Sequence, residues 1–473
     1  MACVQQSVLC WLKRAQDQSH EKSDQLSDMT EHQDQVFNEA YHGVPSSRLT
    51  SVQRWGKLWY KTSLLCGITR VTRRHLPPLC RHSSTAASFK AQDLHVTQTD
   101  QKTQLPDFNN LKFGQTFSDH ILEVEWSIKR GWGKPSITPM HNLSLHPASK
   151  VLHYAVELFE GMKAYKGEDG KIRMFRPLEN MIRMNSTAQR SCLPTFDGEE
   201  LIECMKTLIS IDKDWVPDSR TSSLYIRPTM IGTEPQLGVS RPESALLFVI
   251  IGPVGAYYPT GLKPVTLLAD PKYVRAWPGG SGQYKMGANY GPTLSVGQDA
   301  EKQGCQQVLW LYGEDQQVTE VGAMNIFMYW INEQGEKELI TAPLNGLILP
   351  GITRKSLLEL ARGWGEYKVS EREYTMGDIV KGLKENRVKE LFGAGTACVV
   401  CPVEKILYNN EMLQIPTMSE GAPVAMKFYN TLLDIQSRPG YDEELFHKNN
   451  PKPLKAVWPD CNAPVLVNDI TVL

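Results

Sequence analysis

One lysine lies where an amine could do chemistry. Lys285 stands between Tyr284 and Tyr290 in the glycine-rich stretch SGQYKMGANYGPT, residues 281–293. Taken alone, such a stretch is most often a surface loop whose lysine is solvated, because lysine is rarely buried. The other interpretation is an amine nucleophile in a pocket, able to form a Schiff base with a carbonyl group. The stretch alone does not decide between the two.

The second interpretation makes demands on the rest of the chain. A lysine that forms an imine needs a site that favours its neutral form. If the carbonyl belongs to pyridoxal phosphate, the phosphate needs backbone N–H groups and a cation. The pyridine nitrogen then needs a carboxylate, and the phenolic oxygen needs a hydrogen-bond donor.

The sequence contains a candidate residue or segment for each of these requirements. Tyr290 follows Lys285 closely enough to serve the ring oxygen. Glu320 follows an expected strand, although a lone carboxylate there is usually a surface residue. A helix expected after Pro350-Gly351 offers N–H groups to an anion, as every helix start does. The glycine turn FGAGTA, residues 392–397, brings backbone and hydroxyl groups.

Composition narrows the class of protein. The 473 residues are 41% hydrophobic and 22% charged, which allows a sizeable core. A net charge of −1 gives no reason to expect nucleic acid or an anionic membrane as a partner. We expect no membrane span, because no apolar run reaches about 18 residues. Ten scattered cysteines suit a reducing compartment.

The N-terminal region divides by charge. Residues 1–45 are polar and predict a disordered leader. Residues 46–87 form a basic segment typical of a mitochondrial presequence, whose alternative is a solvated basic linker; residues 46–92 hold nine Lys or Arg and no Asp or Glu. This segment predicts that the protein is located in the mitochondrial matrix, or in the cytoplasm if residues 1–45 mask the targeting signal.

The remainder predicts a mixed α/β (α+β) protein of two domains. Its apolar periodicity predicts helices over 173–192 and 351–365, and strands over 223–232 and 244–252. A hairpin is expected around Gly335, and two strands joined by a glycine turn over 388–403. The expected parts are a small domain over 88–255, a linker over 256–266, a large domain over 267–436 and an irregular tail over 437–473.

Eight motifs in order closely resemble the branched-chain amino-acid aminotransferases, which are fold type IV pyridoxal-phosphate enzymes with the cofactor at the domain interface. The motifs are LFEGMKAY (158–165), SLYIRP (223–228), GTEPQLGVS (232–240), VGAYYP (254–259), YKMGANYGP (284–292), VTEVGAMN (318–325), NGLILPGITR (345–354) and GTACVVCPV (395–403). The resemblance covers about residues 88–436.

The resemblance implies residue roles. It makes Lys285 the Schiff-base lysine and proton shuttle, Glu320 the partner of the pyridine nitrogen, and Tyr290 the donor to the ring oxygen. The residues that match the phosphate contacts are Arg183, Ile352, Thr353 and Thr396. Those that match the substrate pocket are Phe113, Tyr154, Phe159, Tyr257 and Ala397. Tyr225 and Arg227 match the pair that receives the second carboxylate of glutamate. Leu237 and Val239 match a loop that reaches the pocket of the neighbouring subunit. For the aromatic residues taken singly, core packing is the more common explanation.

The implied activity is reversible transamination of leucine, isoleucine and valine with 2-oxoglutarate, in ping-pong order. The implied partners are these small molecules, glutamate, a second copy of the chain in a homodimer, and the branched-chain keto-acid dehydrogenase complex.

Two features depart from the family. Ala323 stands where the family pattern favours threonine, so a hydroxyl near the cofactor is lost. After residue 436 the chain no longer resembles the family, which predicts lower stability if the usual end packs on the large domain. Two other classes are the alternatives, a redox-responsive binding protein on an inactive scaffold, and another fold type IV enzyme such as a D-amino-acid aminotransferase or aminodeoxychorismate lyase. The intact Lys285, Tyr290 and Glu320 disfavour the first.

Cys398 and Cys401 form a C-x-x-C pair. Zinc needs about four ligands and no second pair is visible in the globular part, so we expect no metal site. Inert burial and a redox pair remain as interpretations. The family resemblance favours a thiol switch, in which one cysteine forms a sulfenic acid and the other condenses with it to a disulfide.

Overall fold

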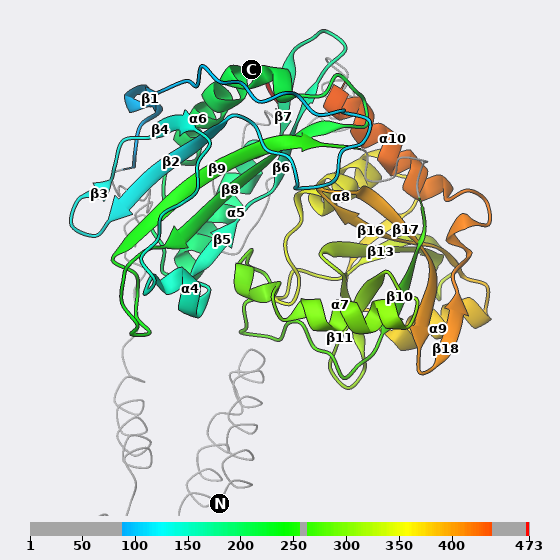
Figure 1. Cartoon of the computed structure of the whole chain (residues 1–473). Coiled ribbons are helices and arrows are strands. Elements are labelled where there is room, and N and C mark those ends of the chain that lie inside the picture. Colours follow the sequence, from blue (N-terminus) through cyan, green and yellow to red (C-terminus); the bar gives the residue numbers. More distant parts are fainter. Residues whose placement is uncertain (1–87, 256–262, 438–469, 473) are drawn as a thin grey trace, which may run out of the picture. The chain divides into compact units, whose positions relative to one another are not determined.

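A computed structural model of the chain describes residues 88–255, 263–437 and 470–472. In this part of the chain the strands form two sheets, one ten-stranded and one nine-stranded (Figure 1). The predicted leader (1–45), the basic segment (46–87), most of the linker and nearly all of the tail lie outside the described residues.

The first sheet is built from the N-terminal half of the described chain. Its order along the sheet is β1 (His95–Val96), β4 (Ser136–Pro139), β2 (His120–Ser127), β9 (Ser244–Val254), β8 (Ser223–Gly232), β6 (Met162–Lys166), β7 (Ile172–Phe175) and β19 (Ile470–Val472), with β3 (Gly131–Trp132) on β2 and β5 (Glu157–Phe159) on β8. All pairs in it are antiparallel except β1 with β4.

Two helices provide the core of this half. They are α5 (Pro177–Arg190) and α6 (Gly198–Ile211), preceded by the short α4 (Lys150–Tyr154). Met181, Met184 and Ala188 of α5 recur at helical spacing and are fully buried, in one apolar cluster with Leu122 of β2 and Leu247 of β9. The sheet therefore presents one apolar face to these helices, as alternating strands allow.

The second sheet closes on itself. Its order is β12 (Gln317–Val321), β11 (Gln307–Tyr312), β10 (Val265–Ala269), β17 (Val399–Tyr408), β16 (Val388–Gly395), β13 (Met324–Ile331), β14 (Lys337–Thr341) and β15 (Lys368–Glu371), with β18 (Glu411–Gln414) on β17. Because β12 also pairs with β13, the strands from β12 round to β13 form a closed ring, which leaves β14 and β15 as an extension.

The helices that accompany this sheet are α7 (Thr293–Lys302), α8 (Ile352–Trp364), α9 (Met376–Lys384) and α10 (Pro423–Ser437). Short 3₁₀ turns occur at Ala91–Asp93, Lys213–Trp215, Gly287–Asn289 and Pro416–Met418. Leu357 and Ala361 of α8 are buried with Phe392 of β16 and Phe428 of α10, so both helices share one core against the sheet.

The predicted fold class is confirmed, and the elements named from the sequence occur with one difference in bounds: the helix predicted over 173–192 begins at Pro177, because Ile172–Phe175 forms β7. Helices α5 and α8, strands β8 and β9, and the hairpin of β13 with β14 around Gly335 occur where the apolar periodicity indicates them. One expectation needs correction. The sequence predicts an irregular tail, but Ile470–Val472 forms a strand antiparallel to β7, because the free edge of β7 offers backbone groups to any extended segment.

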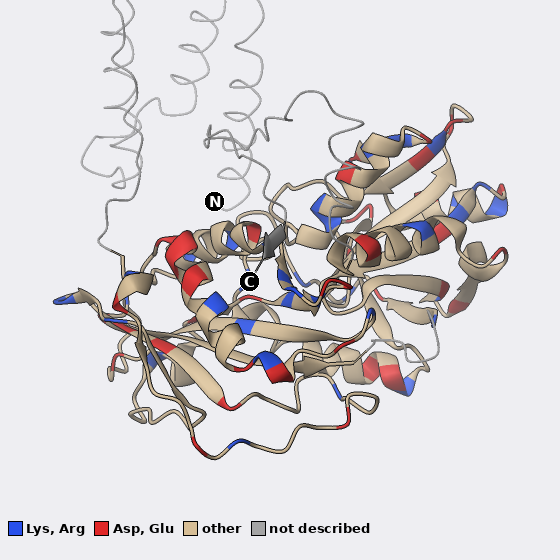
Figure 2. Cartoon of the chain, turned by 90° about the horizontal axis from the view of Figure 1, so that it is seen from above, with Lys and Arg blue, Asp and Glu red and all other residues tan. Residues whose placement is uncertain are grey.

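Basic and acidic residues are intermixed along the described chain in Figure 2, in keeping with the net charge of −1. No helix in the described ranges is long and apolar enough to cross a membrane.

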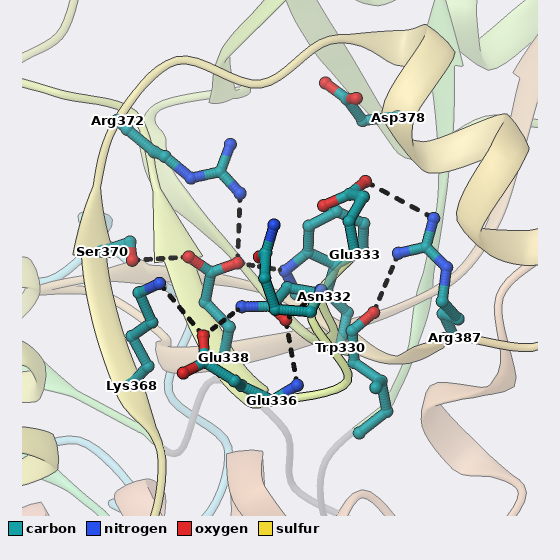
Figure 3. Close-up of polar contacts among 12 residues, drawn as sticks. Trp330, Asn332, Glu333, Glu336, Glu338, Lys368, Ser370, Arg372, Asp378 and Arg387 are labelled. Atoms are coloured by element: carbon teal, nitrogen blue, oxygen red, sulfur yellow. Dashed lines mark hydrogen bonds and ion pairs between the residues drawn. The ribbon is translucent and has the colours of Figure 1, made fainter.

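A buried carboxylate ties together the far strands of the second sheet (Figure 3). Glu338 on β14 is 1% exposed and accepts hydrogen bonds from Trp330 Nε1 at 2.7 Å, Ser370 Oγ at 2.5 Å and Arg372 Nη2 at 3.1 Å. Burial alone would raise the pKa of Glu338, but these donors outweigh it and hold the pKa below its usual value. The charged form of Glu338 therefore stabilises the extension of the sheet.

We predict that Glu338→Gln lowers the free energy of unfolding by about 2 kcal/mol, because buried donors lose a charged acceptor. The difference from wild type should be complete above pH 4.5 and should shrink as the pH falls further, since protonation removes the same charge. Urea unfolding at several pH values measures it. Glu336→Gln, at a side chain 53% exposed, is the control and should cost no more than about 0.5 kcal/mol. Equal effects of the two variants would contradict the assignment.

Candidate active site

The backbone N–H and carbonyl of Lys285 both form hydrogen bonds to residues in the first half of the chain. Its backbone N–H donates to Thr187 Oγ1 of α5 at 3.1 Å, and its carbonyl accepts from Phe159 N of β5 at 3.2 Å. The side-chain Nζ lies 3.2 Å from Tyr290 Oη and 4.3 Å from the centre of the Phe159 ring. The structure thus brings the lysine and the tyrosine of the glycine-rich stretch into contact.

The surroundings of Lys285 favour its neutral amine. Burial, followed by the nearby Arg183 guanidinium, lowers the pKa of Lys285 to about 7. Arg227 acts in the same direction, while Glu160 and Glu320 oppose it. A large fraction of the amine is therefore unprotonated at neutral pH, which is the nucleophilic form.

Glu320 on β12 is a buried carboxylate with a counter-ion. It is 3% exposed, and its Oε2 lies 2.5 Å from Arg275 Nη1. Its Oε1 accepts from the Leu349 backbone N–H at 3.0 Å and from Asn325 Nδ2 at 3.2 Å. Burial raises the pKa of Glu320, and Arg275 is the strongest opposing influence. Sequence reasoning missed Arg275, because a lone arginine in an irregular loop gives no signal of a partner.

A pocket for an anion lies at the start of α8. Ile352 and Thr353 occupy the first turn, where backbone N–H groups have no partner within the helix. Gly351 before them allows a close approach, since a Cβ there would lie 2.1 Å from Asn325 Oδ1. A cavity of about 20 Å³ opens beside this turn and is lined by Ile352, Thr353 and Thr396, among others. The arrangement suits a phosphate group.

Arg183 of α5 lies next to the start of α8, and Lys163 of β6 is a basic residue in the lining of the cavity itself. Its Nε lies 2.7 Å from Glu160 Oε1 and its Nη2 lies 2.8 Å from Oε2, while Nη1 donates to the Pro350 carbonyl at 3.1 Å. Glu160 is fully buried and also accepts from Asn180 Nδ2 at 2.7 Å. Sequence reasoning missed Glu160, although a carboxylate inside the apolar run LFEGM is a signal for a buried partner.

An aromatic wall with one cation lies on the first sheet. Arg227 Nη2 donates to Tyr225 Oη at 3.1 Å, and the guanidinium lies 4.7 Å from the centre of the Phe159 ring. The Phe113 ring meets that of Tyr225 edge-on at 4.9 Å. These predicted pocket residues are therefore together, and Phe159 links them to Lys285.

Other predicted residues lie apart from this group. Tyr154 Oη donates to the Leu237 carbonyl, and the two residues are 38% and 60% exposed. Val239 is 85% exposed. Tyr257 lies outside the described residues. Ala323 is exposed in the turn between β12 and β13.

The C-x-x-C pair follows the turn that contains Ala397. Cys398 and Cys401 are 3% and 1% exposed. The Cys398 thiol donates to Met324 Sδ at 3.1 Å, and burial raises the pKa of Cys398 to about 12. The thiol is therefore protonated at neutral pH in this arrangement.

Comparison with known proteins places this geometry in a family. The family model described as "Amino-transferase class IV" matches residues 157–406. The chain is 58% identical over 352 residues to the cytosolic branched-chain-amino-acid aminotransferase of Mus musculus, covering 74% of this chain and 91% of that protein. It is 56% identical over 372 residues to the mitochondrial form of Rattus norvegicus, covering 77% and 94%. This chain belongs to the branched-chain-amino-acid aminotransferases.

Solved structures of such aminotransferases agree with the fold. The Escherichia coli enzyme has a TM-score of 0.53 at 23% identity and covers 66% of this chain and 94% of that one. A bacterial enzyme solved with pyridoxamine 5'-phosphate has a TM-score of 0.54 at 25% identity, covering 68% and 96%. The predicted fold type IV aminotransferase, its activity and its cofactor, pyridoxal 5'-phosphate, are confirmed by these relationships. The residues present fit the cofactor, because they include a buried lysine with a lowered pKa, a buried carboxylate and the first turn of a helix whose N–H groups suit an anion.

We predict that Glu160→Gln weakens pyridoxal phosphate binding at least about tenfold, because Arg183 loses the two charge-assisted bonds that aim it at the anion pocket. Equilibrium titration of the cofactor-free protein measures the affinity. Glu199→Gln, at an exposed residue of α6, is the control. Unchanged affinity would show that Arg183 needs no support from Glu160.

Proposed function

We propose that the protein catalyses reversible transamination of leucine, isoleucine and valine with 2-oxoglutarate, giving the branched-chain 2-keto acids and glutamate in ping-pong order. The observation that carries the proposal is Lys285, whose pKa of about 7 and contact with Tyr290 suit a nucleophilic amine. Bound pyridoxal phosphate supplies a ring that accepts electrons from the substrate carbanion.

The residues around Lys285 have distinct roles in this proposal. With pyridoxal phosphate bound, Lys285 Nζ would hold the cofactor, and its free amine would take the proton from the substrate Cα. Glu320 would be the carboxylate partner of the pyridine nitrogen, and Arg275 opposes the rise that burial causes in the pKa of Glu320. Tyr290 would donate to the ring oxygen. The residues that would hold the phosphate are Arg183, Ile352, Thr353 and Thr396.

The substrate side combines apolar and charged recognition. Phe113, Phe159 and Tyr225 give an aromatic wall that suits branched aliphatic side chains. Arg227, anchored on Tyr225, receives the second carboxylate of glutamate and 2-oxoglutarate. Ala397 binds the substrate at the turn. One cation at the edge of an apolar wall therefore allows both substrate types.

A homodimer completes the pocket in this proposal. Tyr154, Leu237, Val239 and Tyr257 belong to the parts that resemble the family's subunit contacts and substrate pocket. The exposure of Leu237 and Val239 supports this, because a large apolar side chain gains most when a partner covers it. The branched-chain keto-acid dehydrogenase complex is a further proposed partner, by family resemblance.

Cys398 and Cys401 form a thiol switch in this proposal. Peroxide oxidises Cys398 to a sulfenic acid, and the Cys401 thiol then displaces water to give the disulfide. Burial and the raised pKa of Cys398 keep this thiol unreactive while the turn is closed, so oxidation requires the turn to open first.

The proposed location is the mitochondrial matrix, directed by the basic segment 46–87. Cytosolic and mitochondrial relatives are similarly identical to this chain, at 58% and 56%. The location therefore depends on the N-terminal region and on whether residues 1–45 mask the signal.

We predict that Lys285→Ala lowers transamination at least about a thousandfold while the fold persists, because the matched motif contains no second lysine. In wild type an absorption band of the bound cofactor should disappear with borohydride, and the variant should lack this band. Lys302→Ala, at a side chain 73% exposed, is the control. Turnover near the wild-type rate would remove Lys285 from its role and the proposal with it.

We predict that Arg227→Met raises the KM for 2-oxoglutarate at least about tenfold and that for leucine less than about threefold, because leucine has no second carboxylate. Steady-state kinetics with each substrate varied measures the difference. Arg130→Met, at an exposed arginine outside the site, is the control. Equal changes for both substrates would assign Arg227 a general structural role instead.

A further inference from the structure

A fully buried lysine lies at the start of α4 and has no part in the site described above. Lys150 is 0% exposed, although a lysine is almost never fully buried unless its charge is paired. Its Nζ lies 2.7 Å from Glu234 Oε2, and it donates to Ser240 Oγ at 2.6 Å and to the Ser240 carbonyl at 2.9 Å. The Arg241 carbonyl is a further acceptor at 3.3 Å. The three N–H donors of the ammonium group therefore all have acceptors.

These acceptors all belong to one loop, residues 233–243, which joins β8 to β9. Residues 235–241 of the loop are exposed. In the described part of the chain, no backbone–backbone hydrogen bond joins two residues of 237–242. A segment with so few contacts of its own opens easily. The shape of the loop therefore depends on the side chains that contact it from outside.

Helix α4 contacts the loop near its base and near its tip. Lys150 holds the base, where Ser149 Oγ also donates to the Thr233 carbonyl at 3.3 Å. At the tip, the Tyr154 hydroxyl donates to the Leu237 carbonyl. Lys150 and Tyr154 are four positions apart, which places them on the same face of the helix. One helical turn thus fixes the loop at two separate points.

The contact at the base is the stronger of the two. Tyr154 is 38% exposed, so water competes for its hydroxyl. Lys150 is buried, and the side chain of Glu234 is only 16% exposed. A hydrogen bond to a charged group is roughly twice as strong as one between neutral groups. Loss of the Lys150 ammonium should therefore free the loop more than loss of the Tyr154 hydroxyl.

The loop and α4 expose large apolar side chains. Leu237 is 60% exposed, Val239 is 85% exposed, and Leu152 of α4 is 58% exposed. Exposed apolar side chains of this size are typical of a surface that another protein covers. Leu237 and Val239 lie between the two ends of the segment that the ammonium group holds. Fixing those ends therefore limits where the two side chains can point.

We propose that Lys150 is a positioning residue that locks the loop 233–243 onto α4, so that Leu237 and Val239 are preformed for the substrate pocket of a second copy of the chain. The inference rests on the proposed function, in which this loop completes the pocket of the partner subunit. It adds the residue that orders the loop before the subunits meet. A loop that is already ordered loses less conformational entropy on association, which gives a tighter dimer.

The test compares the holoenzyme with its Lys150→Met variant, which keeps a long apolar chain and removes the charge. Cleavage by subtilisin within residues 234–243, mapped by mass spectrometry, should become at least about tenfold faster. The dissociation constant of the dimer, measured by analytical ultracentrifugation, should rise at least about tenfold. The KM for leucine should rise about threefold or more while kcat changes less than about twofold, because the loop must be ordered each time substrate binds.

A double variant tests whether the ion pair itself is the lock. Lys150→Met leaves the Glu234 carboxylate without its counter-ion, and an unpaired charge in a largely buried position is more costly than a missing pair. Lys150→Met combined with Glu234→Gln should therefore dimerise more tightly than Lys150→Met alone. Additive effects of the two substitutions would show that the side chains act separately, and would contradict the lock.

Two controls separate the lock from general effects. Lys302→Met removes an ion pair with Asp299 at a side chain 73% exposed, and should behave as wild type in every assay. Glu338→Gln lowers stability at the far strands of the second sheet, and should change neither loop cleavage nor dimerisation. Lys150→Met should also keep the borohydride-sensitive band of the cofactor.

Each outcome decides between the inference and the proposed function. If Lys150→Met keeps the wild-type cleavage rate and dimer affinity, or if Glu338→Gln reproduces its effects, the inference is wrong while the proposed function stands. If Lys150→Met does not fold, Glu234→Gln removes the same ion pair from the side of the loop and must meet the same expectations. If wild type transaminates as a monomer, the proposed homodimer fails before the inference does.

Discussion

One buried amine, that of Lys285, governs the site. Arg183 is paired with Glu160 and Arg275 with Glu320, and each pair is buried and close to neutral as a whole. No carboxylate among the described residues forms an ion pair with Lys285, so burial is the main influence on its protonation and lowers its pKa to about 7. Both ion pairs must form before the lysine has this environment, because an unpaired acid nearby would restore the ammonium.

This constraint requires both halves of the chain. Arg183 and Glu160 come with the first sheet and its helix, whereas Arg275, Glu320 and Lys285 follow the linker. Backbone hydrogen bonds from Thr187 and Phe159 fix the lysine across that boundary. Neither half alone contains a complete set of charges, so the chemistry depends on how the two halves dock.

The spacing of apolar residues predicted the helices and strands, but it did not predict which charged side chains pair with one another. Helix 352–364 and the hairpin at Gly335 were predictable because apolar spacing and turn chemistry are local signals. The contact of Lys285 with Tyr290 was expected because five positions separate them. The pairing of Glu160 with Arg183 spans 23 positions and depends on the docking of a strand on a helix, which no local pattern encodes.

The turn after β16 is a second feature that the sequence does not predict. From its sequence, Val399 is a good strand residue, and its left-handed backbone contradicts that preference. Only the packed structure can impose such a conformation, since an isolated peptide would relax it. Lys163 reaches this turn from the first sheet and donates to the Ala397 carbonyl, so the turn is held by the same docking that sets the charge of Lys285. The strained turn and the environment of Lys285 therefore depend on one boundary between the sheets, and a change that loosens it should alter both.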